Sequence, residues 1–171
     1  LSFRRVYDDA LASARRDPMT GVLNKTAFED EAAAMVASSR LTRETLLLAT
    51  VDLDGFKQVN DRHGHATGDI VLKTFSLGLM SEIRRTDRVG RVGGDEFALL
   101  LRAESTDDAR RLAAQVHDRA KTVLAATGHA VTGSMGALIV PSAQALTYAE
   151  LMREADRLMY AAKRGKNGLR V

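Results

Sequence analysis

The connection between two short apolar segments constrains the fold of this chain more than any other feature. Residues 88–92 and 97–101 both read as strands, and only Gly93, Gly94, Asp95 and Glu96 separate them. Glycine and acidic residues in so short a connection are typical of a β-hairpin turn. Strands joined by a hairpin are antiparallel, whereas each connection in a parallel sheet needs a long crossover. The sequence therefore excludes an all-parallel sheet.

The rest of the chain alternates between strand and helix patterns. Strands are expected at 45–53, 88–92, 97–101 and 131–140, with a last edge strand at 168–171. Helices are expected at 1–16, 27–39, 70–85, 107–126 and 148–163, and another begins at Phe56. Asn24 or Thr26 would cap the second of these helices, and Thr106 the helix at 107–126. These elements predict an α+β fold with one mixed, largely antiparallel central sheet flanked by helices.

Composition sets limits on the class of protein. The 171 residues, 45% of them hydrophobic, fit one ordinary domain with its own core. The chain has no cysteine, which excludes disulfides and thiolate metal sites. A net charge of +3, from 25 basic and 22 acidic residues, argues against duplex DNA as a partner. No apolar stretch is long enough to span a bilayer and no signal peptide opens the chain, so we expect a cytoplasmic protein.

The first sixteen residues form a separate segment. Apolar residues recur at Phe3, Tyr7, Ala10 and Ala14, which is the seam spacing of a coiled coil. The segment is either a dimer stalk or an amphipathic helix that packs on its own domain. Because the chain opens at Leu1 inside a helix pattern, we expect a piece of a longer protein. We divide it into a linker helix at 1–16 and one domain at 17–171.

Three carboxylates fall at exposed chain positions. Asp52 ends the first strand, and Asp95 and Glu96 lie on the hairpin. If the hairpin pairs beside the first strand, these acids converge at one edge of the sheet and form a hard-oxygen site suited to Mg²⁺ or Mn²⁺. Gly93 and Gly94 leave bare backbone against which a bulky ligand can lie. The alternative is that these acids are solvated turn residues.

Residues 93–97 match, letter for letter, the signature of the GGDEF family of diguanylate cyclases, and the chain resembles that family in order along 17–171. Further matching segments lie at 17–24, 52–61, 64–69, 134–137 and 155–167. Met19 stands where leucine is usual, and the tail motif is one residue short after Lys163. The resemblance implies a fold similar to the nucleotide cyclase and polymerase palm. It also implies metal-dependent condensation of two GTP into cyclic di-GMP at a homodimer interface, under an upstream sensory domain.

The resemblance also implies roles for individual residues. Asp52, Asp95 and the Leu53 carbonyl would hold the metal. Glu96 would support deprotonation or a second ion, and either Asp95 or Glu96 would be the base. Asn60 and Asp69 would bind guanine, since a carboxylate accepts from the donors of guanine and not from adenine N1. Lys57 would also act as a catalytic cation, and Arg164 would be a substitute for Lys166 as a phosphate contact. The remaining substrate contacts would be Phe56, Lys57, His65, Gly93, Gly94, Lys163 and Lys166.

A product-inhibition site is implied just before the hairpin. Arg84 and Asp87 form the Arg-x-x-Asp pattern at the position of the family's inhibitory site. The alternative is a helix end whose arginines complement the dipole. For the whole chain, the alternatives to a cyclase are a non-catalytic sensor of GTP or cyclic di-GMP, a cyclase acting within one nucleotide, and a scaffold. The intact acids and glycines favour the enzyme, and Asp69 argues against ATP.

Overall fold

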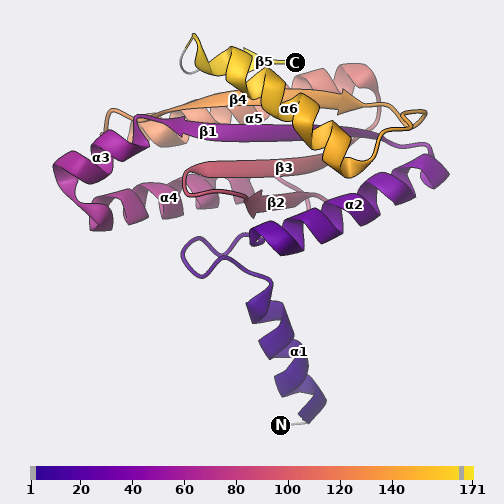
Figure 1. Ribbon diagram of the computed structural model, residues 1–171, viewed down its shortest axis with the longest axis horizontal. Coiled ribbons are helices and arrows are strands. Elements are labelled where there is room, and N and C mark those ends of the chain that lie inside the picture. The colour runs from indigo at the N-terminus through magenta and orange to yellow at the C-terminus, as the bar shows by residue number, and fades with distance from the viewer. Residues whose placement is uncertain (1–2, 166–167) are drawn as a thin grey trace.

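The computed structural model describes residues 3–165 and 168–171, which form one five-stranded sheet with helices on both faces (Figure 1). The helices are α1 (Phe3–Ala14), α2 (Lys25–Thr42), α3 (Phe56–His63), α4 (His65–Met80), α5 (Thr106–Ala126) and α6 (Tyr148–Lys163). The strands are β1 (Thr45–Asp54), β2 (Arg88–Arg91), β3 (Glu96–Ala103), β4 (Thr132–Val140) and β5 (Leu169–Arg170). Their order is β2-β3-β1-β4-β5, and only the pairing of β4 with β5 is parallel. The expected mixed, largely antiparallel sheet is thus confirmed.

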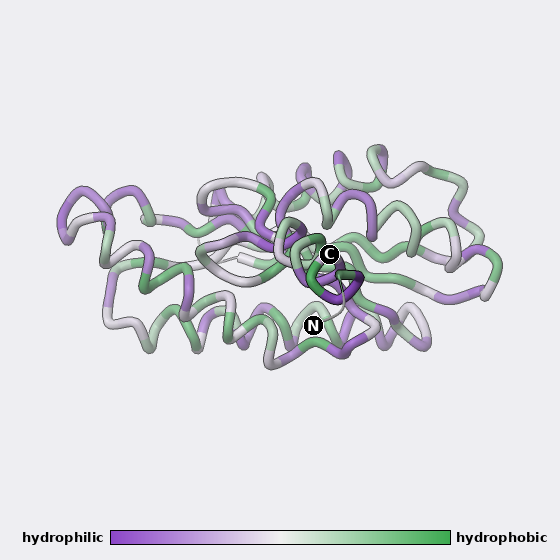
Figure 2. Tube along the Cα trace, turned by 90° about the horizontal axis from the view of Figure 1, so that it is seen from below, coloured by the Kyte–Doolittle hydropathy of each residue, from purple (hydrophilic) through white to green (hydrophobic). Residues whose placement is uncertain are grey.

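Each face of the sheet has its own apolar core, because successive strand residues point to opposite sides. On one face, β1 contributes Leu47, Ala49, Val51 and Leu53, which pack under α4 and α5. On the other face, Leu46 and Leu48 pack under α2 and α6. Figure 2 shows the strands between these two layers of helices. Asp52 is an even number of residues from Leu46 and Leu48 along β1, so its side chain lies on the same face, the one covered by α2 and α6.

Helix α6 approaches the sheet closely at Gly136 in β4. A Cβ atom at this position would lie 2.2 Å from the Met159 nitrogen and 2.4 Å from the Ala155 oxygen. The hydroxyl of Thr50 in β1 donates to the same Ala155 carbonyl at 3.3 Å. Glycine is therefore required here so that the backbone of α6 can lie directly on the middle of the sheet.

Several expected element boundaries need correction. The helix expected at 70–85 is α4, which begins at His65 after Gly64 and ends at Met80, so Ile83 lies beyond it. Ile70, expected to start this helix, lies inside α4 and is 63% exposed despite its apolar side chain. The α5 cap is Ser105, whose side chain accepts from the Asp108 N–H, and Thr106 is already helical. Asn24, not Thr26, caps α2 by accepting from the Ala27 N–H.

Helix α1 projects away from the domain (Figure 1). None of its described residues is buried, and Phe3 and Tyr7 are 87% and 61% exposed. Its end is fixed, because the Asn24 side chain donates to the Ala14 carbonyl at 2.8 Å while capping α2. Across 3–165 and 168–171, the structure contains no helix with the length and apolar character needed to span a membrane.

Candidate active site

Three carboxylates from two neighbouring strands meet on the α6 face of the sheet. Asp52 in β1 is paired with Glu96 in β3, and the Leu53 N–H donates to the Asp95 carbonyl at 3.0 Å. One ligand oxygen from each of Asp52, Asp95 and Glu96 lies within 4.8 Å of the others. The expected convergence of the hairpin acids on the end of β1 is what the structure contains.

Lys163 at the end of α6 reaches across the sheet to this cluster. Its Nζ atom lies 2.7 Å from Oδ1 of Asp52, a side chain that is nearly buried. The hydrogen bond to Asp52 raises the pKa of Lys163, and the nearby charges of Asp52, Asp54 and Asp95 act in the same direction. The ammonium group is thus held in its charged form beside the carboxylates.

One lysine does not neutralise three acids. Burial raises the pKa of Asp95, and the charge of Asp52 raises it further. Burial likewise raises the pKa of Glu96, with added repulsion from Asp52, Asp95 and Asp156. Carboxylate oxygens that lie this close together are suited to bind a hard divalent cation, because its positive charge would relieve their mutual repulsion.

A cavity of about 760 Å³ opens beside the carboxylates. Six residues expected at the site from the sequence line it: Asp52, Leu53, Phe56, Lys57, Asp95 and Lys163. Gln58 and Arg62 of α3 and Thr132 of β4 line it as well and were not expected. Gln58 lies in the matched segment 52–61 without an expected role, and Arg62 and Thr132 lie outside the matched segments.

The expected guanine-binding residues lie between α3 and α4. The Asn60 side chain of α3 lies over Gly68 of α4, where a Cβ atom would come within 1.9 Å of Asn60 Oδ1. Asp69 is the next residue and is partly buried. His65 is exposed at the start of α4. None of these three residues lines the 760 Å³ cavity.

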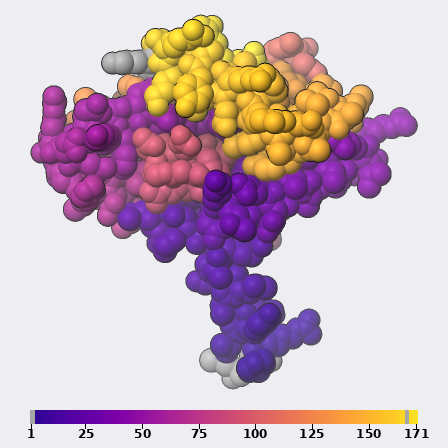
Figure 3. Space-filling view, viewed as in Figure 1, coloured from indigo at the N-terminus to yellow at the C-terminus, as the bar shows by residue number. Residues whose placement is uncertain are grey.

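The hairpin that carries the acids is braced from β2. The Arg91 side chain donates to the Gly94 carbonyl at 2.7 and 3.1 Å and forms an ion pair with Asp17 at 3.3 Å. Neither Gly93 nor Gly94 has a left-handed backbone, and a Cβ atom at Gly94 would meet nothing within 4 Å. The space over Gly94 is therefore open, and Figure 3 shows the hairpin surface between α3 and α6.

A second cavity, of about 480 Å³, lies at the expected product site. Arg84, Arg85, Asp87 and Arg88 line it together with Arg16 and Glu31. The buried carboxylate of Asp87 accepts from the N–H groups of Arg84 at 2.8 Å and of Arg102 at 3.0 Å. Asp87 therefore also fixes the turn before β2, which sequence reasoning missed.

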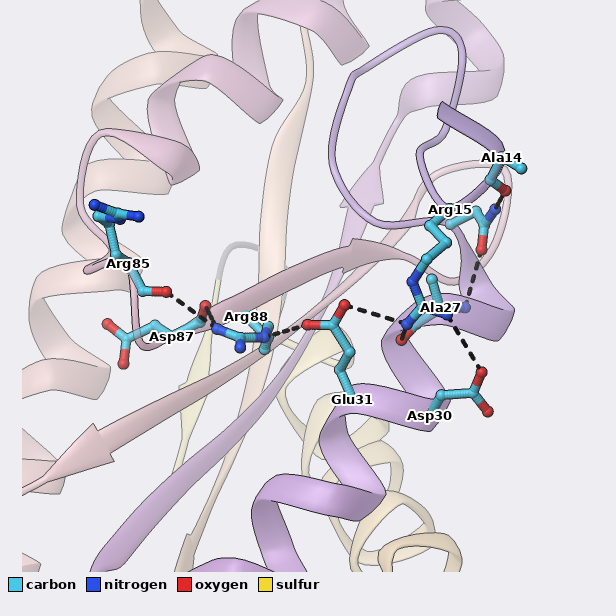
Figure 4. Close-up of polar contacts among 9 residues, drawn as sticks. Ala14, Arg15, Ala27, Asp30, Glu31, Arg85, Asp87 and Arg88 are labelled. Carbon is cyan, nitrogen blue, oxygen red and sulfur yellow. Dashed lines mark hydrogen bonds and ion pairs between the residues drawn. The ribbon is translucent and has the colours of Figure 1, made fainter. Parts of the chain in front are cut away.

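A polar chain joins this turn to the end of α1 (Figure 4). Glu31 of α2 accepts from Arg15 at 3.2 Å through one carboxylate oxygen and from Arg88 through the other. Arg88 in turn donates to the carbonyls of Arg85 at 3.1 Å and Asp87 at 2.8 Å. One acid thus connects the base of the projecting helix to the turn that carries the Arg-x-x-Asp pattern.

Of the tail residues expected to contact phosphate, Lys163 and Arg164 lie within the described residues. Lys163 lies at the carboxylates, and Arg164 caps α6 with an exposed side chain. Lys166, the other expected phosphate contact, lies outside the described residues.

Comparison with known proteins agrees with this arrangement. Residues 14–168 match the model of the diguanylate cyclase GGDEF domain. The diguanylate cyclase TpbB of Pseudomonas aeruginosa is 36% identical over 161 residues, covering 92% of this chain but only 37% of TpbB. A structure of the TpbB GGDEF domain alone has a TM-score of 0.80 at 33% identity, covering 91% of this chain and 92% of that one.

A second solved structure is a microbial GGDEF domain described in its interaction with bis-(3,5)-cyclic di-GMP. Its TM-score is 0.82 at 29% identity, over 95% of this chain and 99% of that one. The sheet with helices on both faces is thus the nucleotide cyclase palm fold that these domains share. By the family model, its relatives and its fold, the chain belongs to the GGDEF family of diguanylate cyclase domains.

Proposed function

We propose that this chain condenses two GTP molecules into cyclic di-GMP. The 3′-oxygen of each GTP attacks the α-phosphorus of the other, and each attack forms one phosphodiester bond and releases one pyrophosphate and one proton. The observation that carries the proposal is the cluster of Asp52, Asp95 and Glu96, joined by Lys163, beside a cavity of about 760 Å³. A divalent ion, Mg²⁺ or Mn²⁺, bound there would neutralise phosphate charge during the transfer.

The residues have separate roles in this reaction. Asp52, Asp95 and the Leu53 carbonyl hold the ion. Lys57 and Lys163 neutralise the triphosphate, because both line the cavity and Lys163 already pairs with Asp52. Either Asp95 or Glu96 accepts the proton of the 3′-hydroxyl, because both carboxylates lie in the same cluster as Asp52.

Guanine binds between α3 and α4. Asn60 lies over Gly68, a position where any side chain would collide with it, and the partly buried Asp69 is the next residue. An ionised Asp69 accepts from the N1–H and amino groups of guanine, while adenine would present an acceptor at N1. Asp69→Ala should therefore lower the preference for GTP over ATP, and an unchanged ratio would exclude this role.

Catalysis requires two copies of the domain, because each GTP must be presented to another. Residues 1–16 serve as a stalk and 17–171 as the catalytic domain. Support comes from α1, which has no buried residue and exposes Phe3 and Tyr7 along one seam. The upstream part of a longer protein, with a sensory role, would set the geometry of this stalk. The expected cytoplasmic setting remains a prediction.

Product feedback acts at the second cavity. Four arginines, Arg16, Arg84, Arg85 and Arg88, surround the partly buried turn, and an anionic dinucleotide can be held there by bidentate guanidinium contacts. Arg84→Ala should lower the affinity for cyclic di-GMP in titration calorimetry while leaving initial turnover intact. Equal affinities would remove Arg84 from the site.

The decisive experiment is incubation with GTP and Mg²⁺ followed by mass analysis of the products. Cyclic di-GMP should accumulate with the wild type and be absent with Asp95→Ala. The control is Asp107→Ala, which removes an exposed acid of α5 that forms an ion pair with Arg110. If wild type binds GTP without turnover, the second candidate holds, namely a non-catalytic sensor of GTP or cyclic di-GMP.

A further inference from the structure

Two histidines from distant parts of the chain lie side by side, with tilted rings, outside the carboxylate site. His63 is the last residue of α3, and His129 lies in the loop between α5 and β4. Their ring centroids are 4.9 Å apart and the ring planes are inclined by 51°. Neither imidazole has a hydrogen bond to another group in 3–165 and 168–171, so its ring nitrogens remain available to a ligand.

The backbone of both histidines is fixed by local contacts. The Thr67 hydroxyl donates to the His63 carbonyl at 2.9 Å. His129 follows Gly128, which lies just beyond the end of α5 with a φ of +73°, and the His129 N–H donates to the Thr127 hydroxyl at 3.4 Å. The His129 carbonyl accepts from Val131 at 2.9 Å. The two imidazoles are thus held on rigid supports, which lowers the entropy that a ligand must remove on binding.

The loop that carries His129 is also seated against the start of α3. A Cβ atom at Gly55 would lie 2.6 Å from the Ala130 carbonyl oxygen. The φ of +83° at Gly55 is also one that other residues rarely adopt. This close approach fixes the loop next to the turn from which α3 begins. The packing of the backbone therefore brings the rings of His63 and His129 together.

The separation of the two rings fits a shared metal ion. Since zinc–imidazole bonds measure about 2.0–2.1 Å, each ring centre lies about 3.2 Å from its ion. Two imidazoles on one tetrahedral or octahedral ion therefore have ring centres about 4.5–5.2 Å apart. The observed 4.9 Å lies within this range. Imidazole is a preferred ligand of Zn²⁺, Ni²⁺ and Cu²⁺ and a poor one of Mg²⁺.

We propose that His63 and His129 bind one transition-metal ion, with water completing its coordination shell. The ion joins the end of α3 to the loop before β4. Both elements also line the carboxylate cavity, the loop through Ala130 and α3 through Phe56, Lys57, Gln58 and Arg62. Metal bound at this pair therefore clamps two walls of the cavity. This site differs from the carboxylate cluster in residues, position and preferred metal.

The test is titration calorimetry of the whole chain, free of affinity tags, with NiCl₂ and with ZnCl₂. Saturating Mg²⁺ is present throughout to occupy the carboxylates. Wild type should bind one ion, and His63→Gln and His129→Gln should each weaken binding at least about tenfold, because either change leaves a single imidazole. Asp95→Asn and His65→Gln are the controls and should bind as the wild type does. Nickel should also raise the melting temperature of the wild type and of neither histidine variant.

Three results would overturn the proposal. The first is no binding of either metal to the wild type. The second is unchanged affinity in His129→Gln. The third is a lower metal affinity in His65→Gln together with an unchanged affinity in His129→Gln. That result would place the ion on His63 and His65 instead. Circular dichroism of each variant establishes that it is folded, and because His63 is exposed and His129 partly exposed, both should tolerate glutamine.

Discussion

Replacing Asp95 by asparagine should stabilise the metal-free protein while it abolishes turnover. Asparagine keeps the size of the side chain and removes one of three acids that crowd together at the end of β1. In the absence of a cation, the charge on Asp95 interacts unfavourably with Asp52, and burial adds to the cost of ionising it. The wild type retains a charge that its own fold disfavours, which is expected of a site built to bind a cation.

The magnitude follows from the separation of the ligand oxygens. Two unit charges 4.8 Å apart repel by about 3.5 kcal/mol at an effective dielectric constant of 20, and by about 1 kcal/mol in water. Asp95 is partly exposed and Lys163 lies near, so the lower part of this range applies. We therefore expect Asp95→Asn to raise the free energy of unfolding by about 1–2 kcal/mol, which corresponds to a rise of about 2–8 °C in melting temperature for a domain of this size.

The assay is thermal unfolding in EDTA as a function of pH. Because folding raises the pKa of Asp95, the folded wild type binds this proton more tightly than the unfolded chain. Its stability therefore falls as pH rises through the raised pKa, and the gap to Asp95→Asn widens toward pH 7. Added Mg²⁺ should stabilise the wild type more than the variant and so narrow or reverse the gap. A variant that melts at or below the wild-type temperature in EDTA at pH 7 would refute this reasoning.

Three further predictions concern the supports of the two cavities. Gly136→Ala places a Cβ atom 2.2 Å from the Met159 nitrogen, so α6 must shift. We expect the free energy of unfolding, measured in urea, to fall by about 1–3 kcal/mol. An unchanged midpoint of the urea transition would contradict the close approach. Lys163→Met removes the cation paired with Asp52 and should raise the KM for GTP about tenfold, whereas an unchanged KM would place the lysine outside the phosphate site. Glu31→Gln breaks the charged link between Arg15 and Arg88 and should lower stability by about 1 kcal/mol in urea, with the Asp30→Asn variant as the control that keeps this link.

The sheet was predictable from the sequence because its signals are local. Alternating or continuous apolar runs define β1, β3 and β4, and the Gly-Gly-Asp-Glu segment fixes the hairpin between β2 and β3. The meeting of Asp52 with Asp95 was predicted only on the condition that the hairpin pairs beside β1, and the structure supplies that pairing. The helix ends were less predictable, because Ser105 and Thr106 are both acceptable caps and only the backbone conformation decides between them.

The contacts that depend on packing gave no local signal. Glu31 and Arg88 are 57 residues apart, and nothing in either segment indicates that they pair. Arg62 of α3 and Thr132 of β4 line the same cavity, although nothing in either segment indicates it. Asp87 was expected as a ligand contact, yet its carboxylate also holds the turn through the N–H groups of Arg84 and Arg102. A sequence pattern names a functional residue without revealing its structural task.

The register of the central strands decides whether the site exists at all. Asp52 of β1 and Glu96 of β3 are direct partners, and both point to the face that α6 covers. A slip of one residue in β1 would turn Asp52 toward the core under α4 and α5 and expose Val51 in its place. That slip would bury a carboxylate among apolar side chains and remove Lys163 as its partner, at a cost of several kcal/mol. The apolar pattern that fixes the register of β1 therefore also aims the carboxylate at the cavity, so that folding and the assembly of the site are one event.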